Sequence, residues 1–150
     1  MQNIFTKIFK GRVVIVGIGN ILKGDDGFGP ELIKRLAGKV KAVCIDAGAT
    51  PENYTKVIAK ENPDTILLVD AVHLDLMPGR YEILKREDIL KSGFTTHDIS
   101  PRMFIEYLEG RTGAKIFLLG IQPQNISLGD GLSDSVKGAL EEIEDLIKNA

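Results

Sequence analysis

The sequence is poor in sulfur and in large aromatic residues, with one cysteine, Cys44, and no tryptophan among 150 residues. A single cysteine excludes an internal disulfide and a cysteine-based zinc cage of the zinc-finger kind. Cys44 lies within the apolar run 42–46, so we expect a core residue there and not a nucleophile. This use of cysteine is typical of a cytoplasmic protein, which is the location we expect.

A large charge of one sign and long apolar runs are also missing. The formal net charge is −2 at pH 7, which creates no field that would attract nucleic acid or an anionic membrane. No apolar stretch has the length needed to span a bilayer. We therefore expect neither a nucleic-acid partner nor a membrane partner.

What remains is the composition of one globular domain over residues 1–150, with 43% hydrophobic and 27% charged residues. Residues 1–10 carry four apolar residues at helical spacing: Ile4, Phe5, Ile8 and Phe9. Polar residues interrupt this run and no small-residue cleavage site follows it, which argues against a secretory signal. We interpret the segment as a short amphipathic N-terminal arm packed on the domain.

Short apolar runs bounded by turn residues predict five strands. They are expected at residues 12–16, 42–46, 65–69, 80–84 and 115–120. Helices separate the first three, and right-handed crossovers then place these strands parallel in one sheet. The fourth strand follows a Met-Pro-Gly turn and is expected to be antiparallel. The predicted fold is a three-layer α/β domain: a twisted, mostly parallel sheet of about five strands with helices on both faces.

The helices are predicted from apolar spacing and capping residues. Thr50 is expected to cap a helix that has Pro51 at its first position, Ser100 to cap another, and Ser133 to begin the last. A further short helix is expected at residues 86–91. The residues expected on apolar helix faces are Leu32, Ile33, Leu36 and Val40, then Val57 and Ile58, then Met103, Phe104, Tyr107 and Leu108, and finally Val136, Leu140, Ile143 and Ile147.

Three polar side chains from distant parts of the chain form the candidate site. Residues 13–30, VVIVGIGNILKGDDGFGP, run from an apolar strand into a glycine loop that carries Asp26. Asp70 ends the apolar strand ILLVD, where an unpaired buried carboxylate is costly. Ligands of open α/β sheets bind outside the carboxyl ends of the strands, so both acids are expected at one edge. If the polar loop before Pro101 folds over that edge, His97 joins them.

Two carboxylates and one imidazole suit a divalent metal such as nickel, zinc or iron and leave positions for water or substrate. Purely structural roles remain as alternatives. Asp25 or Asp26 could cap a helix, and a lone histidine such as His97 is more often structural than a ligand. His73, the second histidine, follows Asp70 closely and could simply pack or point to water.

Patterns for other activities are weaker. Gly17 and Gly19 match the start of a dinucleotide fingerprint, but Leu22 stands where the third glycine is needed. Asp46, which ends the second strand, could pass for the ribose-binding acid, so a nucleotide-binding module is one alternative function. No G-x-S-x-G elbow of a serine hydrolase is present. A glycosidase-like pair formed by Asp26 and Asp70 is not excluded by spacing.

Several motifs, in this order along the chain, resemble those of the nickel-iron hydrogenase maturation proteases. They are VGIGNIL at 16–22, GDDGFGP at 24–30, VDA at 69–71, TTH at 95–97 and LGIQP at 119–123. The resemblance extends roughly from the first strand to the last helix. With ATPEN at 49–53 added, the sequence is most similar to the branch that serves hydrogenase-3 type enzymes.

This resemblance implies an endopeptidase that removes a short C-terminal extension from the precursor of the hydrogenase large subunit after nickel insertion. In the family an acid of the glycine loop, an acid at the end of the third strand and a histidine bind the metal. The matching residues here are Asp26, Asp70 and His97. The loop acid is glutamate in some members, so Asp26 keeps the charge and shortens the reach by one methylene. Asp46 matches another acid of the pattern, with a role in support or substrate recognition.

We count Gly24 and Asp25 with Asp46 as supporting or substrate-recognition residues. Nickel is the expected metal, and the hypothesis that follows is that the precursor supplies it as a recognition tag for cleavage. Whether it also polarises the scissile carbonyl or activates water stays open at this point. The expected protein is a monomer, and a non-catalytic nickel chaperone is the other alternative function.

Overall fold

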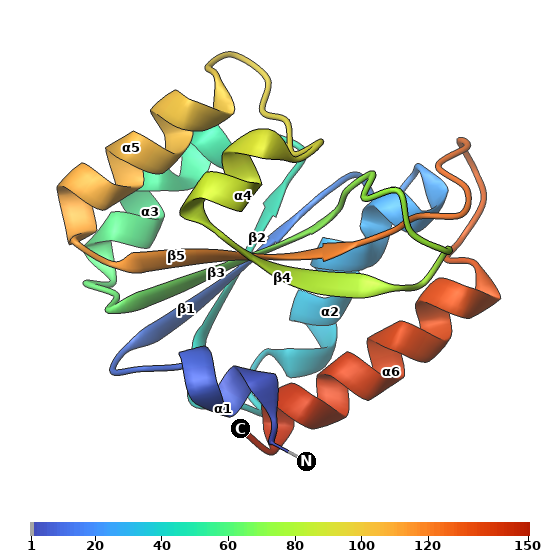
Figure 1. The fold of residues 1–150 in the computed structure, drawn as a ribbon, viewed down its shortest axis with the longest axis horizontal. Helices are drawn as coiled ribbons and strands as arrows, with labels where there is room; N and C mark the ends of the chain where they lie inside the picture. The colour runs from blue at the N-terminus through green and yellow to red at the C-terminus, as the bar shows by residue number, and fades with distance from the viewer. Residues whose placement is uncertain (1) are drawn as a thin grey trace.

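The computed structural model describes residues 2–150 and contains one five-stranded sheet in the order β2-β1-β3-β5-β4 (Figure 1). The strands are β1 Val13–Ile18, β2 Val43–Gly48, β3 Thr65–Ala71, β4 Tyr81–Lys85 and β5 Lys115–Ile121. β1, β2, β3 and β5 are parallel to one another, and β4 pairs with β5 in the antiparallel sense. The predicted sheet, including its antiparallel edge strand, is confirmed.

Helices cover both faces of this sheet, which confirms the three-layer α/β fold. In Figure 1, α3, α4 and α5 lie above the sheet and α1, α2 and α6 lie below it. The helices are α1 Ile4–Ile8, α2 Phe28–Leu36, α3 Thr55–Lys60, α4 Arg86–Lys91, α5 Pro101–Thr112 and α6 Asp134–Lys148, with short 3₁₀ turns η1 at Gly24–Gly27 and η2 at Pro51–Tyr54.

The central strands supply side chains to two separate cores. Ile15 and Leu67 pack with the residues of α2 and α6, whereas Val14 and Leu68 pack with those of α3 and α5. Since helices cover both faces, alternate residues on either side are equally buried, and β1 is buried along its whole length. This is why these strands appear in the sequence as continuous apolar runs.

Gly29 lets the start of α2 approach the sheet very closely. A Cβ atom added at Gly29 would lie 2.4 Å from the carbonyl oxygen of Ile18 and 2.5 Å from that of Val69. Only glycine permits this contact, because those neighbours are backbone atoms that cannot move aside cheaply. The contact places η1, and with it Asp26, over the carboxyl ends of β1 and β3.

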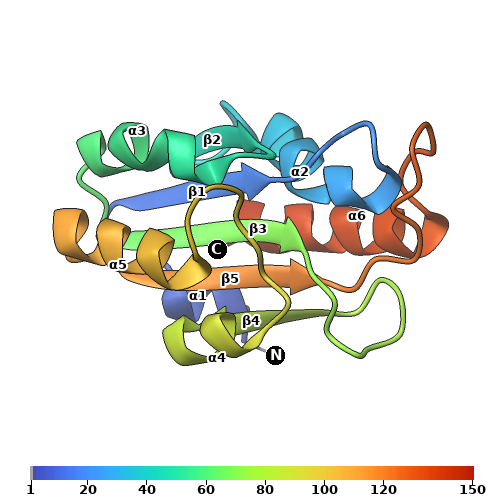
Figure 2. The ribbon, with the colours of Figure 1, turned by 90° about the horizontal axis from the view of Figure 1, so that it is seen from above.

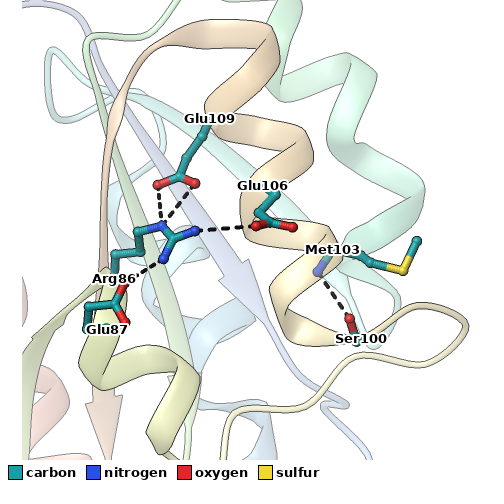
Figure 3. A network of polar contacts seen from close by, with 6 residues as sticks. All are labelled: Arg86, Glu87, Ser100, Met103, Glu106 and Glu109. Carbon is teal, nitrogen blue, oxygen red and sulfur yellow. Dashed lines mark hydrogen bonds and ion pairs between the residues drawn. The ribbon is translucent and has the colours of Figure 1, made fainter.

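An ion-pair network fixes α4 against α5 on the opposite face. Arg86 of α4 lies among three glutamates, and its Nε atom is 2.8 Å from Oε2 of Glu109 (Figure 3). Ser100 caps α5 as predicted, because its hydroxyl accepts the backbone N–H of Met103 at 3.1 Å. The loop that precedes α5 therefore ends at a defined position.

Two side chains predicted to be buried are exposed. Val57 of α3 is 48% exposed and Met103 of α5 is 57% exposed, whereas the adjacent Ile58 and Phe104 are fully buried. Each helix lies on the sheet through one narrow face, so the neighbour of a buried residue points about 100° away from it. Val57 and Met103 therefore point to solvent, whereas Ile105, on the other side of Phe104, is buried with it.

Two helix ends also differ from prediction. The helix α2 ends at Leu36, and Val40 packs on the core from the turn that follows it. Gly38, at φ +77°, reverses the chain there. Thr50 makes no side-chain capping bond, because the segment after it begins as the 3₁₀ turn η2 with Pro51 at its start.

The N-terminal arm packs on the domain as predicted, except that Met1 lies outside the described residues. Phe5 is fully buried in the core that α6 shares, and the side-chain amide of Asn3 donates to the carbonyl of Leu146 at 2.6 Å. Cys44 is half-buried against the same core, and this burial raises the pKa of its thiol. Across residues 2–150, every helix is too short or too polar to cross a bilayer.

Candidate active site

A cavity of about 240 Å³ lies at the carboxyl edge of the parallel strands, and Asp26, Asp70 and His97 all line it. Asp26 comes from η1, Asp70 from the end of β3, and His97 from the loop before α5, which arches across β1 and β3 in Figure 2. The other lining residues are Ile18, Gly19, Lys23, Ala49, Thr95 and Thr96. The structure thus gathers three polar residues that are far apart in the sequence.

A larger cavity, of about 430 Å³, opens near the opposite ends of the strands, beside the N-terminal arm. Phe9, Val40 and Ile147 are among its apolar lining residues, and its lining contains no aspartate, glutamate, histidine or cysteine from the described part of the chain. Arg12 and Lys41 are its charged side chains, and these are cations that do not suit a metal ion. The smaller cavity is therefore the candidate active site.

Asp70 is the most strongly perturbed group of the site. Its side chain is buried at the end of β3, and this burial raises the pKa of the carboxyl well above its ordinary value. The negative charge of Asp26 raises the pKa further, while a backbone hydrogen bond at Ala71 opposes the shift. A buried acid beside a second acid favours the uptake of a proton or a cation.

Asp26 faces the same cavity and also holds the glycine loop together. Its Oδ2 atom accepts the backbone N–H of Asn20 at 2.8 Å. A dinucleotide-binding loop needs its N–H groups free for phosphate, and here a carboxylate occupies one of them. The geometry thus agrees with the missing third glycine in disfavouring the nucleotide-binding interpretation.

Asp25, next to Asp26, points away from the cavity and is fully buried. Its carboxylate accepts the backbone N–H groups of Gln124, Asn125 and Ser133, at 2.8, 3.1 and 2.7 Å, and the Ser133 hydroxyl at 2.9 Å. These bonds fasten η1 to the loop between β5 and α6. Asp25 therefore supports the loop that positions Asp26.

Gly24 and Asp46 have different surroundings. Gly24 has φ +55°, and a Cβ atom there would lie 2.4 Å from the carbonyl oxygen of Asn125, so the two loops touch through the glycine. Asp46 is exposed, accepts the backbone N–H of Gly48 at 3.0 Å and is not among the residues that line the cavity. Its local bond orders the end of β2.

The loop that carries His97 is held by Glu52, a residue that was not among the predicted site residues. Oε2 of Glu52 accepts the backbone N–H groups of His97 and Asp98, each at 3.1 Å. The Thr96 hydroxyl donates to the carbonyl of Ile99 and closes the loop on itself. The other oxygen of Glu52, Oε1, is buried without a hydrogen-bond partner among residues 2–150. Only its place in the ATPEN motif at 49–53 pointed to Glu52.

His73 lies outside the cavity, on the exposed loop after β3. Its Nδ1 atom is 3.2 Å from Nε2 of Gln122, and its Nε2 atom is 3.4 Å from a carboxylate oxygen of Asp75. Gln122 is itself buried and accepts the backbone N–H of Leu74 at 2.6 Å. His73 therefore belongs to a loop structure and not to the cavity.

The three cavity residues face one space but do not form a closed metal cage. Within residues 2–150, no three histidine, cysteine, aspartate or glutamate side chains are grouped closely enough to hold a metal ion by themselves. Two carboxylates and an imidazole are nevertheless donors that suit a divalent transition metal. The arrangement can contribute ligands to an ion that another molecule also holds.

Comparison with known proteins gives one consistent result. The family model HycI, described as hydrogenase maturation protease, matches residues 29–150. The hydrogenase 3 maturation protease of Escherichia coli K12 is 35% identical over 133 residues, which cover 87% of this chain and 85% of that protein.

Solved structures agree with the sequence comparison. The [NiFe] hydrogenase maturation protease HycI from Thermococcus kodakarensis KOD1 is 33% identical, with a TM-score of 0.87 and coverage of 97% of each chain. The endopeptidase HycI from Escherichia coli is 32% identical, with a TM-score of 0.81, covering 93% of this chain and 90% of that one. The chain is a peptidase and belongs to the hydrogenase maturation protease family.

Proposed function

We propose that this peptidase removes the C-terminal extension from the nickel-loaded precursor of a [NiFe] hydrogenase large subunit. One observation carries the proposal: Asp26, Asp70 and His97 line a single cavity at the sheet edge of a chain that belongs to the hydrogenase maturation protease family. The names of its relatives supply the class of substrate, and the three donors supply the means to recognise a metal in it.

Nickel is part of the substrate in this proposal. Asp26, Asp70 and His97 offer two carboxylates and an imidazole, and imidazole is a good ligand for nickel. Because these donors do not close into a cage, they suit an ion that the precursor already holds with its own ligands. Only a precursor that carries the metal would then seat its C-terminal segment at the cavity. A nickel ion bound there supplies a Lewis acid.

The residues around the cavity bind and orient the substrate. Asp70 and Asp26 direct two carboxyl groups at one space, and a divalent cation there would favour the ionised form of Asp70 that burial disfavours. Glu52 holds the backbone of the His97 loop over the cavity, which limits the positions that the imidazole can take. Lys23 adds one positive group to the lining, available to a carbonyl or carboxylate of the extension.

The test is mass spectrometry of a nickel-loaded large-subunit precursor before and after incubation with the protein. Wild type should shorten the precursor by its C-terminal segment. Asp26→Ala, Asp70→Ala and His97→Ala should each abolish processing while keeping the folded circular dichroism spectrum. His73→Ala is the matched control, because it removes the other histidine, outside the cavity, and should process normally.

Each alternative outcome has a defined meaning. Wild-type processing by all three cavity variants would refute the site assignment. A precursor that keeps its length while its nickel binds to the protein would indicate a nickel chaperone. Size-exclusion chromatography of the active protein tests the further expectation that it acts as a monomer.

A further inference from the structure

Four large aliphatic side chains are exposed on two adjacent loops beside the cavity. Ile21 and Leu22, between β1 and η1, are 67% and 63% exposed, and Ile126 and Leu128, between β5 and α6, are 52% and 76% exposed. We call these four residues the aliphatic patch. Single exposed apolar residues are ordinary, whereas several of them on two joined loops favour an interaction site.

The two loops of the aliphatic patch are fastened to each other. The backbone N–H of Gly129 donates to the carbonyl of Leu22 at 2.9 Å, and the N–H of Asp25 donates to the carbonyl of Asn125 at 2.8 Å. Figure 2 shows the two loops side by side at the ends of the strands. Because the buried carboxylate of Asp25 also joins them, the patch is presented on a fixed frame.

A fixed apolar surface binds with less loss of conformational entropy than a mobile one. The loop between β5 and α6 also has hydrogen bonds within its own tip. Ser127 donates its backbone N–H to Oδ1 of Asn125 at 2.9 Å, and the Asn125 amide donates to a carboxylate oxygen of Asp130 at 2.8 Å. Ile126 and Leu128 are therefore held outward by a folded loop and are not left exposed by lack of structure.

The loop that carries Ile21 and Leu22 also contributes residues to the cavity. Lys23 follows Leu22 directly and lines the cavity, as does Gly19 at the other end of the same loop. A polypeptide that brings its cleavage site to Asp26 and Asp70 must also cover the surface next to Lys23. The molecule that occupies the cavity is therefore the one best placed to cover the patch.

We infer that the aliphatic patch is the docking surface for the folded body of the precursor protein, through an apolar face that lies next to its C-terminal extension. This inference rests on the proposed function and extends it: the cavity recognises the metal and the extension, and the patch recognises the folded protein that carries them. Apolar contacts of this kind supply affinity and place the extension in register with the cavity.

The test measures processing kinetics of the nickel-loaded precursor with Leu128→Gln and the double variant Leu22→Gln/Leu128→Gln. Val57→Gln is the matched control, since Val57 is an exposed aliphatic residue on α3, away from both loops. We expect the double variant to raise KM about tenfold or more, with kcat at saturating precursor and the melting temperature unchanged. Leu128→Gln should show part of this effect, and Val57→Gln none.

Direct binding of the precursor to the immobilised protein separates this inference from the proposed function. If wild type binds the precursor without cleaving it, the proposed function is refuted. In that case, weaker binding by the double variant than by wild type and Val57→Gln would still support the patch as a docking surface. Cleavage by wild type and double variant with equal KM would overturn the inference. A wild-type dimer that the double variant converts to a monomer would also overturn it, because a second copy of the chain would then cover the patch.

Discussion

Replacing Asp25 by alanine leaves four hydrogen-bond donors without their acceptor inside the protein. Hydrogen bonds to a charged group contribute about 1.5–3 kcal/mol each, but these four share one carboxylate and are not additive. Breaking a buried charged network from one side costs about 3–5 kcal/mol, which is the loss that we expect for Asp25→Ala. At about 2–4 °C per kcal/mol for a chain of this size, the melting temperature falls by roughly 6–20 °C.

Asp25→Asn separates the shape of the side chain from its charge. The amide oxygen can replace Oδ2 of Asp25, which accepts the bonds from Gln124 and Asn125. The amide nitrogen then faces the backbone N–H of Ser133, so one donor is opposed by another. We expect a loss of about 1–3 kcal/mol, smaller than for alanine.

Thermal and urea unfolding followed by circular dichroism measure these losses, and hydrogen exchange locates them. The amides of Gln124, Asn125 and Ser133 should exchange faster in both variants of Asp25, because their acceptor is removed or weakened. Asp46→Ala is the control, since this exposed carboxylate accepts a single backbone bond and should cost about 1 kcal/mol or less. An Asp25→Ala variant within about 0.5 kcal/mol of wild type would refute the structural role.

Three further predictions concern the cavity. Because the pKa of Asp70 is raised in the folded state, its ionised form destabilises the fold at neutral pH, and this cost vanishes as the pH falls below the ordinary range near 4. Asp70→Asn should therefore melt a few degrees higher than wild type at pH 7 and equally at pH 3, and a lower melting temperature at pH 7 would contradict this. Glu52→Ala should lower kcat about tenfold or more, because it releases the backbone of His97. Glu52→Gln keeps an acceptor oxygen and should retain most of the wild-type kcat. Equal kcat for Glu52→Ala and wild type would exclude this role. Calorimetry should show that Ni²⁺ alone binds the protein more weakly than about 1 μM, and nanomolar binding would show a resident site instead.

The sheet was predictable because its strands are buried on both faces. The runs that became β1, β3 and β5 have no polar face to break their pattern, and glycine or a carboxylate marks where each one ends. The positions of Asp26 and Asp70 followed from the same topology, since the carboxyl ends of parallel strands share one edge. His97 could be placed there only through the resemblance of its loop to known motifs, because loop paths have no periodic signal.

The support of the site was not predictable in the same way. Asp25 and Asp26 are adjacent in the sequence, yet one is enclosed by donors from a loop about a hundred residues away and the other faces the cavity. Glu52 likewise acts on a backbone 45 residues distant. Such long-range bonds between a carboxylate and main-chain N–H groups depend on how distant segments meet in the folded chain. Local sequence patterns carry no information about these meetings.

The charges of the cavity explain why a metal-bearing partner would be favoured over a bare one. Asp70 is buried beside Asp26, and both the burial and the neighbouring charge raise the pKa of its carboxyl group. In the free protein, protonation of Asp70 therefore removes part of this electrostatic cost. A divalent cation relieves it more fully, because it attracts both carboxylates at once and replaces the hydration that burial removed. On the proposed function, nickel carried by the precursor provides that cation, while a metal-free precursor would have to approach two acids without it. The same electrostatics that make Asp70 costly in the free protein therefore favour cleavage only after the metal has been inserted.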